Sequence, residues 1–488
     1  MAVYQHGIYK QEQPTGLTTP STTSAGLQVC VGTAPLNQAK NPTAAVNIPV
    51  LCNSFAEAQE AVGYSDDFAD YTLCEDIDAS FRNFAVAPII LINVLDPAKH
   101  KKTLEAVTAP VTDHQAVIEQ PGILPATAAV TAGETALVKD TDYTLSFDDG
   151  GNLVVTLLLA GAGADAEEIS VTADALDPSK VTDADIVGAT DPTTGKNTGL
   201  QAVRDIFPKL GVVPGLIVAP KWSSSASVAA AMNAMCSNLG AQFTCNCVVD
   251  ISSSAANGAI VYTGVKTAKE TAGLNGKHEI AVWPKAKIGD KIYCYSSIFA
   301  ASIASTDAGN DDVPNLSPSN KPLPISAMVL EDGTEVLLTL EQANIVNSYG
   351  VVTAVNFGGF RSWGNNTAAY PASTDPIERW IGVRRFFDWW GNNLVSTFFQ
   401  RVDDLTNYRL VENIVDSENI TGNSYVNRGY CAQAHVQFSE SENPITQILG
   451  GKIVFHMYLA PYTPAEAIEF ILEFNPTAIE AELNGGAA

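Results

Sequence analysis

Apolar residues near the start of the chain recur with the spacing of buried strands and short helices. Leu27–Gly32 and Ile89–Val94 are mainly apolar runs of strand length. Between them, Ser54–Glu57 and Thr72–Glu75 each match a capping box, the Ser/Thr-x-x-Glu pattern that opens a helix. Beyond the second box, apolar side chains continue at helical spacing as far as Phe84. The chain is therefore predicted to begin as an α/β fold.

A strand–helix–strand unit follows in the middle of the chain. Val212–Pro220 is a strand-like apolar run, and a helix-length segment with one apolar face follows it and ends at Gly240. The next run, Phe243–Val249, alternates apolar and polar residues. Because this unit joins parallel strands, it predicts a parallel sheet. Further strands are predicted at His278–Pro284 and Val351–Phe357.

The last third of the chain predicts a long helix and then strands. Asp375 is a good N-cap, and Pro376 at the first helical position favours a helix that continues to about Phe399. Strands are predicted after it, at Ala432–Phe438, Ile453–Ala460 and Ile468–Phe474.

The composition changes abruptly between residues 100 and 199. This segment has no Cys or Trp, and its Tyr143–Phe147 and Leu153–Leu159 runs predict a hairpin around a Gly/Asp turn. We interpret it as a small β-sandwich inserted into the α/β (α+β) core, which is built from the N- and C-terminal parts of the chain. The predicted organisation is an N-terminal arm (1–25), a core (26–99 and 200–464), the inserted outward-facing domain (100–199), and a C-terminal arm strand and tail (465–488).

The net charge of −26 argues against a general nucleic-acid or anionic-membrane surface. The charge is uneven, since residues 100–199 carry 16 acidic residues against 5 lysines, whereas seven of the nine arginines lie between Arg361 and Arg428. An acidic outer domain and an Arg-rich inner one would suit an assembly with different neighbours on its two sides.

The N-terminus lacks the charged and apolar regions of a secretory signal, and the longest apolar runs are too short to span a bilayer. The eight cysteines form no C-x-x-C pair and lie in apolar segments. We interpret them as reduced core residues of a protein assembled in the cytoplasm.

No catalytic or cofactor motif of the common types occurs, neither a P-loop nor a G-x-G-x-x-G fingerprint. His435 and His456 lie in neighbouring predicted strands and are interpreted as a core or surface pair. Cys245 and Cys247 share one strand face and are interpreted as packing residues rather than metal ligands. Two other classes stay open: an α/β enzyme, which a bound cofactor would reveal, and a cell-surface adhesin-like protein, which a signal peptide would mark.

Four of the six tryptophans (363, 380, 389 and 390) lie among the arginines of the C-terminal third. Such a mixture could stack nucleic-acid bases. The acidic total and the nearby carboxylates favour a helix anchor or a protein–protein interface, where Trp and Arg are enriched.

Two stretches of this region carry a family resemblance. Gly358–Thr367 reads Gly-Gly-Phe-Arg-Ser-Trp-Gly-Asn-Asn-Thr, a constrained turn, and Arg379–Asp388 reads Arg-Trp-Ile-Gly-Val-Arg-Arg-Phe-Phe-Asp. Together with segments in the expected order over residues 1–99 and 200–488, they resemble contractile tail sheath proteins of phages and R-type pyocins. Residues 345–464 are the most family-like part, and the segment 100–199 matches only as a variable insertion.

The resemblance implies a structural protein without enzymatic activity, cofactor or metal. It implies hexameric rings that stack around an inner tail tube and contract to drive the tube through a cell envelope. The implied partners are further copies of the chain, the tube, the baseplate and the tail terminator, with no nucleic acid and no membrane insertion. The implied location is a virion tail assembled in the host bacterial cytoplasm. A sheath of a phage-derived injection system or bacteriocin is the alternative.

Three sets of residues follow from this resemblance. Terminal arms that add strands to neighbouring subunits would use Val3, Tyr4, Ile8, Tyr9, Ile468, Phe470, Leu472 and Phe474. The tube would face Arg379, Arg384, Arg385, Arg401 and Arg409. The alternative for some of these arginines is pairing with Glu378, Asp388, Asp403 and Asp404 within the subunit. The family-signature turn comprises Gly359, Arg361, Trp363 and Gly364.

Overall fold

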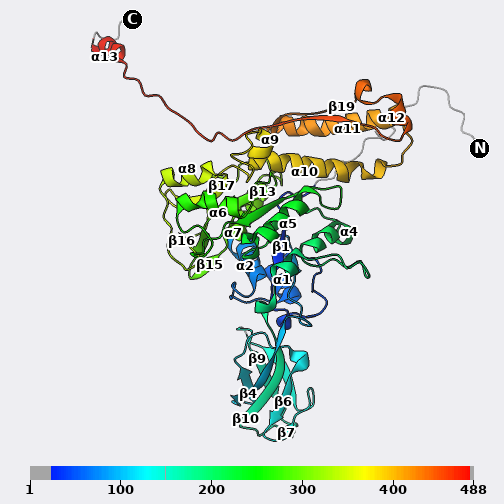
Figure 1. Cartoon of the computed structure of the whole chain (residues 1–488), viewed down its shortest axis with the longest axis vertical. Coiled ribbons are helices and arrows are strands. Elements are labelled where there is room, and N and C mark those ends of the chain that lie inside the picture. Colours follow the sequence, from blue (N-terminus) through cyan, green and yellow to red (C-terminus); the bar gives the residue numbers. More distant parts are fainter. Residues whose placement is uncertain (1–22, 149, 484–488) are drawn as a thin grey trace, which may run out of the picture.

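An eight-stranded mixed sheet forms the centre of the computed structural model, which describes residues 23–148 and 150–483 (Figure 1). The strand order is β18-β17-β13-β12-β11-β1-β3-β2. The six inner strands run parallel, and β2 and β18 are antiparallel edges. The strands span Gln28–Gly32 (β1), Val50–Cys52 (β2), Ile89–Asn93 (β3), Leu216–Val218 (β11), Asn246–Asp250 (β12), Glu279–Val282 (β13), Val351–Asn356 (β17) and Phe360–Trp363 (β18).

Helices cover this sheet and bury its strands. Every residue of β1, β3, β11, β12 and β13 is buried, as expected for a parallel sheet covered on both faces. The helices are α1 (Phe55–Val62), α2 (Thr72–Ile77), α3 (Asp183–Val187), α4 (Ile206–Leu210), α5 (Ala226–Ser237), α6 (Val265–Thr271), α7 (Tyr295–Ala308) and α8 (Leu340–Ser348). A small antiparallel sheet of β14 (Lys285–Ile288), β15 (Lys291–Tyr293) and β16 (Ala327–Val329) lies beside them.

The predicted strand–helix–strand unit is confirmed. β11 and β12 are parallel neighbours, with Ile217 opposite Cys247, and α5 connects them. The α5 side chains Val228, Met232 and Cys236 are fully buried, and they are the face that the apolar spacing indicated.

A β-rich lobe, residues Lys101–Leu176, extends below the core in Figure 1. Its antiparallel sheets have the orders β4-β10-β6-β7 and β5-β9-β8 and share one hydrophobic cluster. The predicted hairpin is present as β8 paired with β9. The strands are β4 (Lys101–Pro110), β5 (Gln115–Ile118), β6 (Ala129–Ala132), β7 (Thr135–Ala136), β8 (Tyr143–Phe147), β9 (Leu153–Leu157) and β10 (Glu168–Leu176).

The expected end of the inserted segment at residue 199 differs from the structure. Val181 and Ile186 pack in the main hydrophobic cluster, and Leu200 follows them there. The chain has therefore returned to the core soon after Leu176. The apolar face of α3 is buried against the core there.

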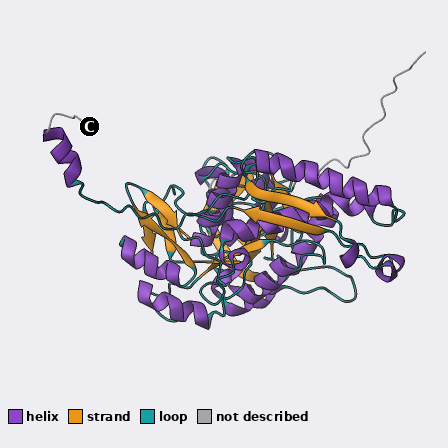
Figure 2. Cartoon of the chain, turned by 90° about the horizontal axis from the view of Figure 1, so that it is seen from above, coloured by secondary structure: helices purple, strands orange, loops and turns teal. Residues whose placement is uncertain are grey.

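The C-terminal part forms a layer above the sheet in Figure 1. The helices α10 (Ile381–Phe398) and α11 (Tyr408–Asn427) precede a two-stranded antiparallel sheet of β19 (Cys431–Gln437) and β20 (His456–Pro461). Phe386, Trp389 and Trp390 of α10 fill a separate cluster with residues of β19. The remaining helices are α9 (Pro376–Arg379), α12 (Ile445–Leu449) and α13 (Pro476–Leu483). Figure 2 shows that α13 stands away from the body.

Three further sequence predictions differ from the structure. The long helix from Pro376 is broken at Trp380, which has extended backbone angles. Ile468–Phe474 carries neither helix nor strand, and its side chains are exposed. Thr72 is the first residue of α2 rather than its cap. Its Oγ1 accepts a hydrogen bond from the amide of Thr33, the residue that follows β1 (3.2 Å).

Candidate assembly surfaces and their internal networks

The signature turn is a β-hairpin between β17 and β18. Gly358 (φ 65°) and Gly359 (φ 130°) form its tip, where a side chain would strain the backbone. Phe357 beside them has 82% of its surface exposed. The hairpin therefore presents an aromatic ring at the edge of the sheet.

The other signature residues fix this hairpin to the core. Arg361 donates from Nη1 to the Asn320 carbonyl (2.8 Å), and Trp363 donates from Nε1 to Asn344 Oδ1 (2.9 Å). Gly364 has φ 142°, and a Cβ there would lie 3.0 Å from the Val352 Cα. These residues are structural supports of the hairpin.

The residues after the hairpin explain the break between α9 and α10. The amide of Ile381 donates to the Asn365 carbonyl (2.9 Å), and the amide of Thr367 donates to the Arg379 carbonyl (2.8 Å). Asn366 and Trp380 form an isolated antiparallel bridge. The Asn-Asn-Thr segment thus takes the hydrogen bonds that a continuous helix would make.

Arg379, the first expected tube-facing arginine, attaches the chain's C-terminal segment. Its Nη2 lies 2.8 Å from Glu466 Oε2, and its Nε donates to Asn366 Oδ1 (2.7 Å). The guanidinium carbon lies 4.4 Å from the Tyr370 ring centre and 3.9 Å from that of Trp380. Its charge is satisfied within the subunit.

Arg384 faces inward to Asp388, the centre of a buried network. The Asp388 carboxylate accepts from Arg384 Nε (3.1 Å) and Nη2 (2.8 Å), Thr244 Oγ1 (2.9 Å) and Asn246 Nδ2 (3.0 Å), and lies 3.2 Å from His278 Nδ1. Burial opposes ionisation, but the His278 hydrogen bond and the Arg384 charge hold the pKa of Asp388 below its ordinary value. The network ties α10 to the sheet.

Arg385 is 2% exposed and forms a buried ion pair with Asp307 of α7. Its Nη2 also donates to the Ala25 carbonyl (3.0 Å). The expectation that Arg384 and Arg385 face a tube is therefore wrong for this conformation, because each guanidinium is directed to an internal carboxylate.

Arg401 and Arg409 are the two expected tube-facing residues that lie at the surface. Arg401 Nη1 is 3.5 Å from Asp404 Oδ2, with about a third of its side chain exposed, and Arg409 is exposed at the start of α11. Both lie at the tip joining α10 to α11, where Leu405 is 83% exposed.

The expected strand-exchange residues fall into two groups: one lies outside the described residues, and the other lies on the exposed C-terminal segment. Val3, Tyr4, Ile8 and Tyr9 lie outside the described residues. Ile468, Phe470, Leu472 and Phe474 are 73%, 84%, 94% and 78% exposed.

The sheet of β19 and β20 lies near the root of this C-terminal segment. The expected His435–His456 pair does not form, because His435 lies opposite Tyr458 and His456 opposite Gln437. His456 instead stacks on Tyr458, with ring centres 4.4 Å apart, and its Nδ1 lies 3.3 Å from Glu442 Oε1.

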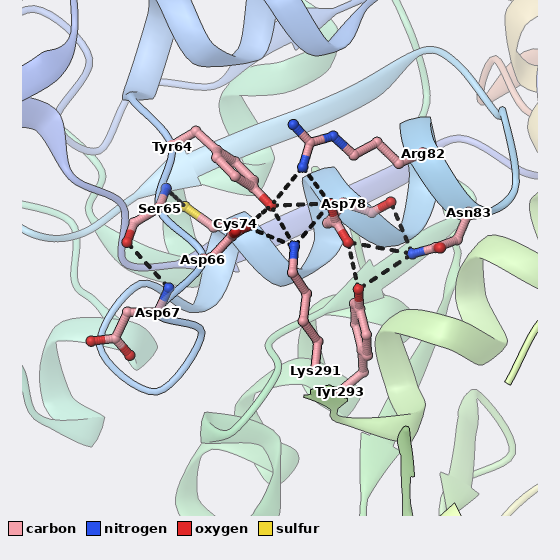
Figure 3. A network of polar contacts seen from close by, with 10 residues as sticks. All are labelled: Tyr64, Ser65, Asp66, Asp67, Cys74, Asp78, Arg82, Asn83, Lys291 and Tyr293. Atoms are coloured by element: carbon pink, nitrogen blue, oxygen red, sulfur yellow. Dashed lines mark hydrogen bonds and ion pairs between the residues drawn. The ribbon is translucent and has the colours of Figure 1, made fainter. Parts of the chain in front are cut away.

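A second polar network joins the loop after α1 and the end of α2 to β15 (Figure 3). Asp78 lies in a π-helical segment, Asp78–Asn83, that continues α2. Its carboxylate accepts from Tyr64 Oη (3.0 Å), Arg82 Nη1 (3.0 Å) and Tyr293 Oη, and Lys291 Nζ lies 3.7 Å away. Burial and the bond to Asp78 raise the pKa of Tyr293. The network fastens the N-terminal helices to the small sheet.

All eight cysteines are buried and free of disulfides. In the parts of the chain that the structure describes, no group of three His, Cys, Asp or Glu side chains could hold a metal ion. Among the helices of residues 23–148 and 150–483, none has the length and apolarity needed to cross a membrane.

Asp307 and Glu466 were not identified from the sequence. Asp307 is the sole charged residue in α7, and a lone carboxylate in an otherwise uncharged helix could have indicated a buried ion pair. Glu466 carries no such pattern, since its partner Arg379 is 87 positions away.

Comparisons with known proteins identify tail sheath proteins of phages as relatives of the chain. No protein-family model matches the chain. The chain is 27% identical over 490 residues to the tail sheath protein of Burkholderia phage BcepMu, covering 97% of each. It is 26% identical over 298 residues to the tail sheath protein of Escherichia phage P2, covering 58% of this chain and 68% of that protein.

Solved structures share the fold. The sheath complex of PVC, an extracellular contractile injection system, in its contracted state has a TM-score of 0.58 at 15% identity, covering 97% of this chain and 98% of that one. The contracted helical sheath of the anti-feeding prophage (AFP) has a TM-score of 0.56 at 15% identity, covering 97% and 99%. The 6-fold symmetrised AFP baseplate has a TM-score of 0.56 at 14% identity, with the same coverage.

The sequence relationship and the shared mixed α/β fold define a structural, non-enzymatic class of contractile-tail proteins. The chain belongs to the tail sheath protein family. It is a contractile tail sheath subunit; its sequence relatives are phage proteins, and the PVC injection-system sheath shares its fold.

Proposed function

We propose that copies of this chain form hexameric rings that stack helically around an inner tail tube. Shortening of the stack drives the tube through a cell envelope. The similarity to contracted PVC and AFP sheaths and to a 6-fold symmetrised AFP baseplate supports this proposal.

The observation that carries the proposal is the exposed C-terminal segment. Ile468, Phe470, Leu472 and Phe474 alternate along the chain and would share one face of an extended strand. Apolar side chains exposed to this degree mark an interaction surface. A neighbouring subunit's sheet would bury them.

The sheet of β19 and β20 is the proposed acceptor. Two strands alone are marginally stable in water, and an unpaired edge favours an added strand. The outer edge of β19 is already engaged, because Asn419 bonds to both the amide (2.8 Å) and the carbonyl (3.0 Å) of Val436. The edge of β20 is therefore the one we assign to an incoming arm.

The proposed contacts with other tail proteins lie elsewhere on the subunit. The tip carrying Arg401 and Arg409 is the candidate tube-facing region. Rings at the two ends of the stack would contact the baseplate and the tail terminator. Assembly would take place in the host bacterial cytoplasm, before the particle is released.

The β-rich lobe is proposed to face outward and to be dispensable for assembly. Most of its buried apolar residues form a hydrophobic cluster separate from that of the core, and only Leu124 and Leu176 of the lobe's buried residues pack in the main cluster. The acidic excess of this part of the chain favours solvent over burial.

Negative-stain electron microscopy of the purified protein tests the proposal. We expect hollow, striated cylinders for the full chain, and dispersed subunits of unchanged circular dichroism after deletion of residues 465–488. Deletion of residues 1–20 is expected to have the same effect. Full-length protein that stays monomeric at high concentration would contradict the proposal.

A sheath of an injection system or bacteriocin is the second candidate. The PVC and AFP neighbours favour it, whereas the two sequence relatives are phage proteins. Flanking genes for capsid and replication proteins would support the phage assignment, and flanking genes for toxin cargo would support the other.

A further inference from the structure

The segments that lead to the two chain termini both attach to two consecutive helices, α9 and α10. Thr23–Ala25, the N-terminal root, lies along α10. Glu466, the C-terminal root, is bound by Arg379 at the end of α9. In Figure 1 the described chain beyond the C-terminal root runs out to α13, away from the body of the molecule.

The N-terminal root contacts three residues spaced four apart on α10. Asn393 Oδ1 accepts from both the amide (2.7 Å) and Oγ1 (2.9 Å) of Thr23, and Trp389 Nε1 donates to the Thr23 carbonyl (2.7 Å). Arg385 Nη2 donates to the Ala25 carbonyl (3.0 Å). Positions four apart share one face of a helix, so the root runs antiparallel to α10.

The C-terminal root has a single charged attachment. Arg379 is 22% exposed at its side chain and Glu466 is 39% exposed, and their atoms are 2.8 Å apart. Arg379 is held between the rings of Tyr370 and Trp380, which orient the guanidinium.

α10 between the two roots is held rigidly. Phe386, Trp389 and Trp390 are at most 3% exposed on its buried face. Asp388 and Arg385 bind it to the sheet and to α7. At 1.5 Å per residue, the 12 positions from Ile381 to Asn393 within α10 correspond to about 18 Å.

We propose that α9–α10 is a strut that sets the separation and direction of the two terminal arms and carries the tension between them. Arg379, Trp389 and Asn393 are the positioning residues. This inference rests on the proposed function, in which the arms link neighbouring subunits. Because each root binds α9–α10 directly, pulling on the arms loads this helix pair before the central sheet.

The N-terminal root is tested with a matched pair of substitutions. Trp389→Phe with Asn393→Leu removes the bonds to Thr23, whereas Trp390→Phe removes an equally buried indole donor that bonds Glu418 instead (2.8 Å). Limited proteolysis of unassembled subunits measures release of the root. We expect cleavage before residue 26 to accelerate about tenfold in the double variant, as loss of bonds of this kind predicts, and not in the control.

The C-terminal root is tested by Glu466→Gln, with Glu469→Gln as the control of equal charge change. Spin labels at Ser24→Cys and Ala467→Cys report the distance between the roots, because the native cysteines are buried. We expect one narrow distance distribution in wild type, unchanged on assembly, and a broad one in Glu466→Gln only.

The third measurement is the urea concentration at which assembled cylinders dissociate. We expect both root variants to assemble into cylinders that dissociate at lower urea concentration than wild type, while the two controls match wild type. Unchanged proteolysis and distance distributions in the root variants, or equal weakening by the controls, would overturn the strut. If wild type formed no cylinders, the proposed function would fail, and the subunit measurements would still decide whether α9–α10 fixes the roots.

Discussion

Arg384 donates two hydrogen bonds to Asp388, one turn further along α10, at 3.1 Å and 2.8 Å. The Arg384 side chain is 13% exposed and that of Asp388 is 4% exposed. Because Asp388 also accepts from Asn246 of β12, the pair connects the helix to the central sheet. Both residues belong to the family-like stretch Arg379–Asp388, and their side chains make contacts inside the subunit.

Removal of this carboxylate should destabilise the subunit strongly. Asp388→Ala leaves Arg384 buried without its partner, which typically costs about 3–5 kcal/mol of unfolding free energy. Asp404→Ala removes the carboxylate of the exposed pair with Arg401 and should cost about 0.5 kcal/mol or less. Urea denaturation of unassembled subunits measures both, and equal effects would contradict the assigned role of the network.

Stability should depend on pH through Asp76. Its carboxylate is fully buried without a well-formed hydrogen bond; burial raises its pKa to about 7, although the neighbouring Ser297 hydroxyl and Cys30 thiol act in the opposite direction. Between the ordinary pKa of about 4 and this value, the folded state holds a proton that the unfolded state has lost. Stability from this group is therefore present at low pH and lost as the pH rises to 7.

Asp76→Asn, which mimics the protonated carboxyl, should remove this loss. We expect it to stabilise the subunit at pH 8, by up to about 4 kcal/mol, and to change little at pH 4. Thermal unfolding of both proteins across this range gives the comparison. An equal shift at both pH values would mean that folding does not raise the pKa of Asp76.

Charge reversal should separate internal from tube-facing arginines. Arg409→Glu is expected to weaken co-assembly with an acidic tube, more at low salt than at high salt, while the subunit unfolds as wild type does. The salt effect follows from screening, with a Debye length of about 10 Å at 0.1 M. Arg384→Glu should instead lower subunit stability. Normal tube co-assembly of Arg409→Glu at low salt would exclude this residue from the interface.

A single lysine in the C-terminal segment should block polymerisation. Leu472 is 94% exposed, so Leu472→Lys should leave the unfolding midpoint of the isolated subunit unchanged. Buried against a neighbour's sheet, the ammonium would be desolvated, and cylinders should be lost. Glu473→Lys, on the other face of an extended strand, should still give cylinders. Sedimentation and electron microscopy distinguish these outcomes.

Replacement of the β-rich lobe should preserve assembly if the cut follows the structure. Lys101 and Leu176 lie opposite each other in β4 and β10, so a short Gly/Ser linker can join the flanking residues. Deletion of the wider segment 100–199 also removes Ile186, which is fully buried in the main core. We expect cylinders from the first protein and insoluble protein from the second. Failure of the first to fold would show that the lobe supports the core.

Local patterns predicted the elements whose interactions are close in sequence. Ser54 caps α1, its side chain accepting from the Glu57 amide (3.2 Å), as the capping box indicated. The unit of β11, α5 and β12 followed from apolar spacing alone. In such elements, tertiary contacts and local preference agree.

The errors arose where distant residues compete for the same groups. Glu75 fits the capping-box pattern but is 3% exposed and accepts from the Cys294 amide, 219 positions away. The break at Trp380 depends on Asn366 in another segment. Arg385 was predicted to lie at the surface because nothing near it in sequence identifies Asp307 as its partner. Asp388, four positions after Arg384, was a visible alternative partner for that residue.

The chain enters and leaves the β-rich lobe through two hydrogen-bonded neighbours, Lys101 and Leu176. Apart from the packing of Leu124 in the main cluster, the core is joined to the lobe through these two adjacent strand ends, whatever the size or charge of the domain between them. Other folded modules whose termini lie together could occupy this position without altering the register of the central sheet. In the proposed assembly of stacked rings, enzymes, adhesins or fluorescent reporters placed here would be displayed at one copy per protomer.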